Sequence, residues 1–409
     1  MKSEKNEIYK YKLEEPAPIL DKKKNKFNLI IYCVTVLSCI IAFQLIRKNL
    51  KSNEAPKIYL RKTENNSPDF SVNKAISYEE NGQTLYSKYG YINMNELDKE
   101  YYGKSKAENS VANNHIHIAL CFNEDYHLLA SVTIASILKN ADSTSFIHLH
   151  IIALNGLKFE TMKKVYSLKE KINNNSEFIF YNGKKAEEDF ELGAKVSERG
   201  IIDYARLLIP ELLTNINKVI SLDIGDILVE KDLFELYNTD LQYFAYSAVV
   251  DAYPRCFLES IFNHKVKYVN GGVVLLNVQK WRQIELYKYV VKMYKYVLTK
   301  TKYYKPYADI INDFLPLLST GYLPLKFNMP EYVNLNNTQS KIQMVERNCS
   351  YYRDKRNEVI EAERNVVIRN LFDNKVYKGE GSDEIKNDWK KYAELTGFYE
   401  EIKNKYNLQ

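Results

Sequence analysis

From His115 onward, short apolar runs alternate with segments whose apolar residues recur at helical spacing. The apolar runs, typical of buried strands, are 116–122, 146–154, 178–182, 219–223 and 244–250. Segments with helical spacing, 125–140 and 158–172, separate the first three runs. A further strand begins at Gly271 and leads into a helix that extends through 285–298. This alternation predicts a Rossmann-like α/β fold, with a mostly parallel sheet covered by helices on both faces.

The N-terminal part has a different pattern. Residues 27–46 form an apolar stretch of twenty residues without a charge, with lysines before it and Arg47 and Lys48 after it. Such a stretch is long enough to cross a bilayer as a helix, and no small-residue cleavage site follows it. We expect a cytoplasmic tail at 1–26, a transmembrane signal anchor at 27–46, a polar stem with short ordered pieces at 47–113, and a globular domain at 114–409. A buried globular helix is the alternative for the apolar stretch.

This arrangement predicts a single-pass type II membrane protein whose globular domain lies in the lumen of the Golgi or the endoplasmic reticulum. Four Asn-x-Ser/Thr triplets follow the apolar stretch and would be usable for glycosylation in such a lumen. They begin at Asn65, Asn174, Asn336 and Asn348. Nucleic-acid binding receives little support, because the net charge is only +6 over 409 residues and no basic stripe is interleaved with aromatic residues.

Two aspartates at the end of an apolar strand are the first candidate for chemistry. In the segment LDIGD, Asp223 and Asp226 flank Gly225, which allows a sharp bend. Carboxylate oxygens placed in this way can bind a hard divalent cation, Mn²⁺ or Mg²⁺, which could in turn hold a diphosphate. A solvated turn is the alternative. Asn123 also follows a predicted strand, and ligands of α/β sheets bind at the carboxyl ends of strands.

Five segments resemble, in the same order, those of the family 8 glycosyltransferases, retaining nucleotide-sugar transferases with the GT-A fold. They are IALCFNEDYHLLASVTIASIL, IIDYARLLIPELL, LDIGDILVEKDLFEL, VNGGVVLLNVQKWR and GYLPLKFN. The resemblance covers about residues 115–400. It implies a GT-A domain and an enzyme, a hexosyltransferase, that moves glucose or galactose from a UDP-sugar to a hydroxyl group of a glycan, a protein or a lipid-linked acceptor.

The resemblance also implies roles for individual residues at the nucleotide. Tyr126 would stack on uracil and the Asn123 amide would bind a base edge. Arg206 would lie near the nucleotide, and Lys375 would contact the diphosphate. Simpler interpretations remain open for three of them: a core aromatic for Tyr126, a salt bridge to a neighbouring acid for Arg206, and a solvated surface lysine for Lys375.

At the sugar, the resemblance implies that Asn270, Gly271 and Gly272 let the backbone approach closely while the Asn270 amide recognises hydroxyl groups. A plain tight turn would equally explain the two glycines. In the segment PYADIIND, Asp309 is the aspartate that faces the reacting sugar if a two-residue deletion is assumed. Without a gap, Tyr307 and Ala308 replace the family's aspartate and glutamine.

The chain departs from the family pattern in two further ways. Two residues separate the acidic pair where the family has one, and the glycine between them is predicted to absorb the insertion. The late histidine that the family supplies as a metal ligand is missing, and Arg369 or Asn370 occupies that stretch. Asn370 can coordinate a cation through its carbonyl oxygen, whereas Arg369 can oppose the diphosphate charge directly. These departures favour an alternative function, a catalytically inactive, membrane-tethered protein that binds a nucleotide, a glycan or a partner protein.

Overall fold

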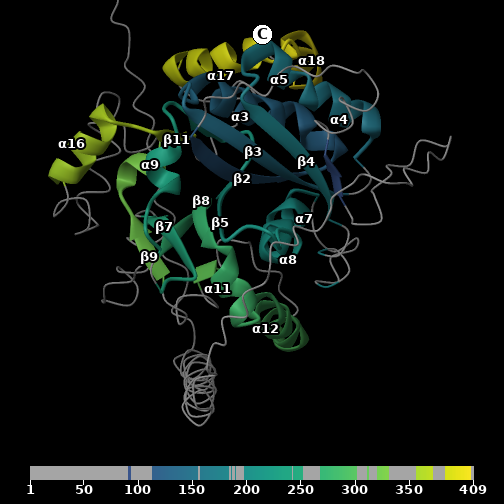
Figure 1. Cartoon of the computed structure of the whole chain (residues 1–409), viewed down its shortest axis with the longest axis vertical. Helices are drawn as coiled ribbons and strands as arrows, with labels where there is room; N and C mark the ends of the chain where they lie inside the picture. Colours follow the sequence, from purple (N-terminus) through teal and green to yellow (C-terminus); the bar gives the residue numbers. More distant parts are fainter. Residues whose placement is uncertain are drawn as a thin grey trace, which may run out of the picture. The chain divides into compact units, whose positions relative to one another are not determined.

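An eight-stranded sheet forms the centre of the described part of the protein (Figure 1). The computed structural model describes residues 91–93, 113–154, 157–183, 186, 189, 198–241, 243–251, 268–301, 311–312, 320–330, 356–371 and 383–406. In spatial order, the strands are β1 (Tyr91–Asn93), β4 (Ser176–Asn182), β3 (Ser145–Ala153), β2 (Asn114–Phe122), β5 (Lys218–Leu222), β8 (Val269–Asn277), β7 (Tyr246–Val250) and β9 (Thr320–Leu323).

Parallel pairs dominate this sheet, as the sequence predicts. Strands β4, β3, β2 and β5 run parallel to one another, and β7 pairs in parallel with β9. Strand β8 lies between β5 and β7 and is antiparallel to both. Because of this reversal, the beginning of β8 lies beside the end of β5, where Leu222 pairs with Val273. Residues that start one strand and residues that follow another therefore meet at one edge of the sheet.

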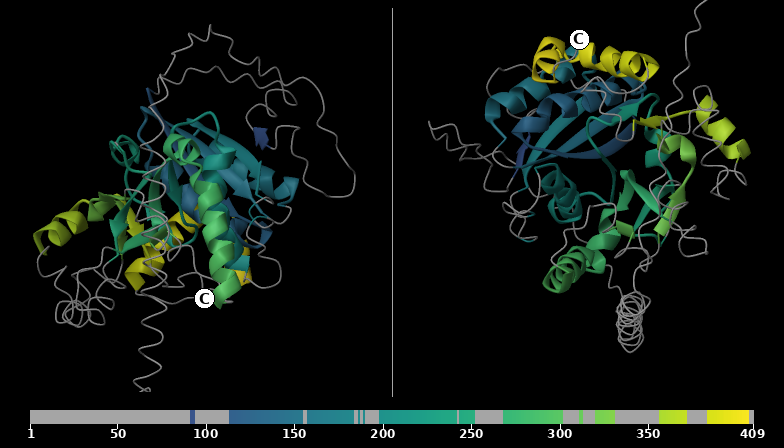
Figure 2. Two further views of the ribbon diagram at one scale, coloured as in Figure 1. Left: turned by 90° about the horizontal axis from the view of Figure 1, so that it is seen from below. Right: turned by 180° about the vertical axis from the view of Figure 1, so that it is seen from behind.

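Helices cover both faces of the parallel strands. The α-helices of the described residues are α3 (His127–Asn140), α4 (Phe159–Tyr166), α5 (Leu168–Ile172), α7 (Glu198–Ala205), α8 (Ile209–Leu212), α9 (Phe234–Tyr237), α11 (Val278–Gln283), α12 (Leu286–Thr301), α16 (Arg356–Arg364), α17 (Asp383–Leu395) and α18 (Tyr399–Tyr406). Figures 1 and 2 show α3, α5, α17 and α18 on one side of β2–β4, and α7 and α8 on the other side. The predicted strands and helices from 116 to 298 are confirmed apart from shifts at their ends, except that the segment 158–172 divides into α4 and α5 and the helix after β8 divides into α11 and α12.

A second, three-stranded sheet adjoins α3. Its order is β10 (Met329–Pro330), β11 (Ile368–Asn370) and β6 (Ile227–Val229). Strand β11 is parallel to β10 and antiparallel to β6. The chain passes from the large sheet to this one between β5 and β6, through the predicted acidic turn. Segments far apart in the sequence are thus assembled around residues 223–226.

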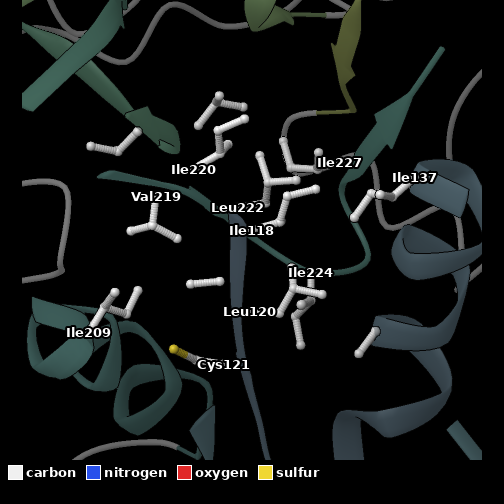
Figure 3. Close-up of a cluster of buried hydrophobic side chains, with 14 of the residues drawn as sticks. Ile118, Leu120, Cys121, Ile137, Ile209, Val219, Ile220, Leu222, Ile224 and Ile227 are labelled. Atoms are coloured by element: carbon white, nitrogen blue, oxygen red, sulfur yellow. The ribbon is translucent and has the colours of Figure 1, made fainter. Parts of the chain in front are cut away.

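The apolar core continues beneath this turn (Figure 3). Ile224, the residue between Asp223 and Gly225, is 1% exposed and belongs to the same buried cluster as Leu120, Ile137 and Ile227. Full burial of an isoleucine side chain contributes roughly 1.5–3 kcal/mol. The acidic turn is therefore anchored in the core by the side chain of Ile224.

A polar cluster lies on the face of β2–β4 that points away from α3, where His117 contacts Tyr237 of α9. It contains four histidines, His115 and His117 from β2 and His148 and His150 from β3. His115 Nδ1 lies 2.9 Å from His148 Nε2, and His117 Nδ1 lies 2.9 Å from His150 Nε2. At the far side of these pairs, His148 Nδ1 lies 2.8 Å from Glu177 Oε2, and His150 Nδ1 lies 3.0 Å from the Tyr181 hydroxyl. We call the four histidines, without Glu177 and Tyr181, the histidine cluster.

Two members of the histidine cluster are held neutral. Burial, together with the neighbouring His148, lowers the pKa of His117 to about 4. Burial also lowers the pKa of His150 well below its ordinary value. The rings of His117 and His148 stack with their centroids 4.4 Å apart, so a proton on one ring disfavours a proton on the other. The fold therefore opposes protonation at the centre of the cluster.

Several predicted features lie outside the described residues. These are the tail 1–26, the anchor 27–46, and most of the stem 47–113, of which residues 91–93 form β1 at the edge of the sheet. Asp309 and Lys375 also lie outside them. Within the described ranges, no helix combines the length and the apolar character needed to cross a bilayer.

Candidate functional site

The predicted nucleotide turn directly follows β2. Asn123 is 3% exposed, and its Oδ1 accepts hydrogen bonds from the backbone N–H groups of Asp125 and Tyr126 at 3.2 and 3.3 Å. Tyr126 is half-buried against the core and is the last residue before α3. Asn123 thus shapes the turn that presents Tyr126, which is where the sequence places a nucleotide-binding turn.

The acidic turn begins where β5 ends. Gly225 has φ +81°, a left-handed conformation that side chains other than glycine rarely adopt. The chain therefore bends sharply at the glycine between Asp223 and Asp226, as the sequence predicts. Asp223 N donates to Gly272 O at 2.8 Å, and Leu371 N donates to Asp226 O at 2.8 Å. The two aspartates are therefore fixed through their backbones to β8 and to the end of β11.

Arg206 lies under the strand that carries the acidic turn. Its side chain is 2% exposed, and Nε donates to Ser221 Oγ at 3.0 Å while a terminal nitrogen donates to Ser221 O at 3.3 Å. Cys121 is buried nearby, and burial raises the pKa of its thiol, so this cysteine is an inert core residue. Arg206 is thus a buried cation that binds β5 at Ser221, two residues before Asp223.

A network of amides surrounds the start of β8. Asn270 Nδ2 donates to Asp251 Oδ2 at 3.0 Å, and Asn270 Oδ1 accepts from Gly272 N at 2.7 Å and from Asn328 Nδ2 at 2.9 Å. Asn370 Nδ2 donates to Asn328 Oδ1 at 2.9 Å. Four side chains from four separate segments of the chain are therefore oriented by one another, which fixes the amide of Asn270.

A side chain at Gly272 would force the neighbouring amides to move. A Cβ atom built there would lie 2.9 Å from Asn270 Oδ1 and 3.0 Å from Asn370 Nδ2. The structure brings Asn270 and Gly272 to the acidic turn, since Gly272 O accepts the Asp223 N–H. Gly271, which lies between Asn270 and Gly272 in the sequence, is buried near the start of β8. The sequence-predicted Asn-Gly-Gly segment and acidic pair thus form one site.

Strand alternation separates the two residues that stand in place of the family's late histidine. Asn370 is 5% exposed and faces the amide network, with Nδ2 3.4 Å from Asn270 Oδ1. Arg369 forms an ion pair with Glu230, with Nε 2.6 Å from Oε1 and a terminal nitrogen 3.3 Å from Oε2. Of the two, only Asn370 is therefore brought to the Asn270 side of the site, and the guanidinium of Arg369 is engaged elsewhere.

The donor groups at the turn are suited to a hard cation. Asp223 and Asp226 are half-buried carboxylates, and Asn370 adds an amide, so the available ligand atoms are oxygens. The part of the chain that the structure describes contains no group of three or more His, Cys, Asp or Glu side chains that could hold a metal ion. A cation here would need the Asn370 amide, a backbone oxygen, water or the diphosphate to complete its coordination.

Comparison with known proteins identifies the family. Residues 117–352, more than half of the chain, match the model described as "Glycosyl transferase family 8". The chain belongs to glycosyl transferase family 8. A protein of Haemophilus influenzae Rd named "Putative glycosyltransferase" is 28% identical over 170 residues, which cover 37% of this chain and 51% of that protein.

Two solved structures share the fold of this family 8 chain. The WbbM bifunctional glycosyltransferase superposes with a TM-score of 0.57 at 20% identity, over 74% of this chain and 53% of WbbM. The galactosyltransferase LgtC, solved with donor and acceptor sugar analogues, superposes with a TM-score of 0.50 at 23% identity, over 69% of this chain and 95% of LgtC. The chain thus spans about half the length of the Haemophilus protein and of WbbM, and its fold is GT-A-like.

Two residues of the family 8 site were missed from the sequence. Asp251 follows the apolar run that forms β7, which is the same signal that identified Asp223. Asn328 lies in the segment GYLPLKFN, where nothing in the sequence shows that its amide meets Asn270. Asn312, from the segment PYADIIND, binds both backbone groups of Val269 through its amide at 2.7 and 2.9 Å. Asn312 therefore supports the start of β8.

Proposed function

We propose that this family 8 protein transfers a hexose, glucose or galactose, from a UDP-sugar to a hydroxyl group of a glycan, protein or lipid-linked acceptor, with retention at the anomeric carbon. The observation that carries this proposal is the hydrogen bond of 2.8 Å from Asp223 N to Gly272 O. It joins the acidic turn to the segment that presents the Asn270 amide. A group that can hold a diphosphate thus lies directly beside a group that can bind a sugar.

Each part of the site has a defined task in such a transfer. Tyr126 would stack on uracil and Asn123 would hold the shape of that turn. The network of Asn270 and Asp251 would orient the sugar hydroxyls without needing to reorganise, because its amides already have fixed partners. Arg206 would stabilise negative charge from beneath β5.

The acidic turn would supply the charge stabilisation for departure of the diphosphate. Asp223 and Asp226, with the Asn370 amide oxygen, would hold Mn²⁺ or Mg²⁺, which when bound accepts negative charge on the leaving diphosphate. Asp309 would face the reacting sugar and Lys375 would contact the diphosphate, as the family resemblance implies. Residues 27–46 would anchor the protein in the membrane with residues 47–409 in the Golgi or endoplasmic reticulum lumen.

Binding of a nucleotide or glycan without turnover is the second candidate. It is favoured by the amide of Asn370 at the position of the family's histidine ligand, because a neutral amide binds a divalent cation more weakly than imidazole or carboxylate does. Such a protein would keep the shape of the nucleotide turn but would lack a strong cation site.

Calorimetric titration of the full-length protein with UDP, with and without Mn²⁺, separates these functions. A transferase requires binding that depends on Mn²⁺ and that is abolished by Asp226→Asn. The matched control is Asp383→Asn, which removes the same charge from an exposed position on α17 and should bind as the wild type does. Binding that is independent of the cation and unchanged in Asp226→Asn would favour the second candidate. A folded protein that binds no UDP in either condition would reject the UDP-sugar transferase.

A further inference from the structure

Strand β6, which begins directly after the acidic turn, has two different neighbours along its two edges. On one edge it pairs with β11, and Asp226 O and Glu230 N extend that ladder by bonding to Leu371 N and Val367 O. Backbone groups alternate in direction along a strand, so Gly225, Ile227 and Val229 face the other edge. That edge is occupied by helix α3.

Side chains of α3 take the place of a partner strand at this edge. Thr133 Oγ1 accepts from Gly225 N at 3.0 Å and donates to Ile227 O at 3.1 Å. One hydroxyl thus binds the backbone on both sides of Asp226. Thr133 is completely buried, so water cannot replace these bonds.

The same face of α3 continues the pattern along β6. Ser136 Oγ accepts from Val229 N at 3.0 Å, and Asn140 Nδ2 donates to Val229 O at 2.8 Å. Residues 133, 136 and 140 are spaced by three and four positions, so they lie along one face of the helix. Thr133, Ser136 and Asn140 therefore share one task, which is to hydrogen-bond β6 and the turn before it.

The remaining backbone group of Gly225 is bound from another helix. Trp389 of α17 is 1% exposed, and its Nε1 donates to Gly225 O at 3.2 Å. Both polar backbone groups of the left-handed glycine are thus held by side chains, Thr133 from one helix and Trp389 from another. A buried peptide group that loses such a partner is costly, so both bonds favour this single conformation of the turn.

We propose that Thr133 and Trp389 are positioning residues that hold the acidic turn in the conformation required by a divalent cation and a diphosphate. This inference rests on the proposed function. By the family resemblance, the turn carries one residue more than is usual. A longer turn can adopt more conformations, so contacts from other elements are needed to fix the separation of the Asp223 and Asp226 carboxylates. Helix α3 also begins immediately after Tyr126, so one rigid element supports the nucleotide turn at its start and the acidic turn along its side.

The chain contains a matched control for each positioning residue. Thr396 is also completely buried and bridges two backbone groups, donating to Ala393 O at 2.6 Å and accepting from Phe398 N at 2.9 Å. Trp281 is 1% exposed and donates Nε1 to Ala245 O at 2.9 Å. Thr396→Val and Trp281→Phe therefore remove the same kinds of bond from places that do not contact the acidic turn.

The test uses the full-length wild type and the four variants Thr133→Val, Trp389→Phe, Thr396→Val and Trp281→Phe. The first readout is the Mn²⁺ concentration that gives half-maximal UDP binding. We expect it to rise about thirtyfold in Thr133→Val, which loses two hydrogen bonds, and about fivefold in Trp389→Phe, which loses one, at about 1 kcal/mol for each bond. Thermal unfolding of each control should match that of its partner variant, while its Mn²⁺ requirement should remain that of the wild type.

The second readout is hydrogen exchange of residues 224–229 in metal-free protein, which does not depend on the function. We expect faster exchange in Thr133→Val than in Thr396→Val, because the Gly225 N–H loses its acceptor. Unchanged exchange in Thr133→Val, or an unchanged Mn²⁺ requirement in both turn variants, would overturn the inference. If the wild type binds no UDP but exchange rises in Thr133→Val, the proposed function is rejected while the hold of α3 on the turn stands.

Discussion

Acidification is expected to destabilise the domain through the histidine cluster. His117 faces His115, His148 and His150 within the sheet, and Tyr237 of α9 lies over its ring at 6.0 Å between centroids. The charged groups nearby are Glu177 on β4, which binds His148, and Lys218, whose ammonium group lies over the Tyr237 ring. Because burial lowers the pKa of His117 from 6.5 to about 4, the unfolded chain binds a proton at pH 5 that the folded domain excludes.

The magnitude follows from proton linkage. For one group whose pKa falls from 6.5 to about 4 on folding, the free energy of unfolding decreases by about 2 kcal/mol between pH 7 and pH 5. Above pH 6.5 neither state is protonated at this site, so the contribution to stability is constant there. The loss therefore begins as the pH falls through 6.5 and is complete near pH 4. His150 acts in the same direction, because burial lowers its pKa as well.

Urea unfolding at pH 7 and pH 5 measures this effect. The chain has two tryptophans, Trp281 and Trp389, and both are buried in the described domain, so their fluorescence reports its unfolding. The comparison is between the wild type and His117→Gln, which keeps a hydrogen-bonding side chain beside His150 but does not titrate. Carboxylates outside the cluster contribute equally to both proteins, and burial, the largest cause, keeps the pKa of His150 low in both. We expect the wild type to lose about 2 kcal/mol more than the variant on going from pH 7 to pH 5.

An equal loss in both proteins would refute this reasoning. The same conclusion would follow if the His117 ring titrated near pH 6.5 in NMR spectra of the folded protein, with its resonance assigned by its absence from the variant. Either result would mean that the pKa of His117 in the folded protein is not lowered by its burial.

Three further predictions follow from the glycines and the buried polar contacts. Gly225→Ala and Gly397→Ala, at φ +81° and +71°, should each lower the free energy of unfolding by about 1–2 kcal/mol in urea titrations, but only Gly225→Ala should also weaken Mn²⁺-dependent UDP binding. Asn328→Ala should lower stability by about 2 kcal/mol, seen as a lower Tm, because the half-buried amide of Asn270 and the buried amide of Asn370 lose a partner. Arg206→Lys should lower stability by about 1–3 kcal/mol despite the retained charge, because lysine cannot reproduce the two-point contact with β5; an unchanged urea midpoint would contradict this.

The parallel strands and the helices between them could be predicted because their patterns are local. Continuous apolar runs identified β2, β3, β4, β5 and β7, and the two carboxylates after β5 identified the acidic turn. The antiparallel direction of β8 could not be predicted, because a strand's apolar pattern reads the same in either direction. That direction is what brings Asn270 and Gly272 to Asp223.

The choice between Arg369 and Asn370 also required the structure. Both residues belong to the three-residue strand β11, and a pairing shifted by one residue would exchange their faces. The register with β6, in which Asn370 pairs with Ile227, decides it. The hydrogen bonds of the buried hydroxyl groups of α3 could not be predicted either, because their backbone partners lie more than 90 residues away along the chain.

The separate anchoring of the two strands beside the acidic turn has a consequence for how this loop can change in length. The register of β5 is set upstream by β2 and β8, and the register of β6 is set downstream by β11. An insertion or deletion between Leu222 and Ile227 therefore alters the loop without sliding either strand. A change in the length of this loop is therefore expected to change the affinity for the cation, while the pairing of the surrounding strands stays the same.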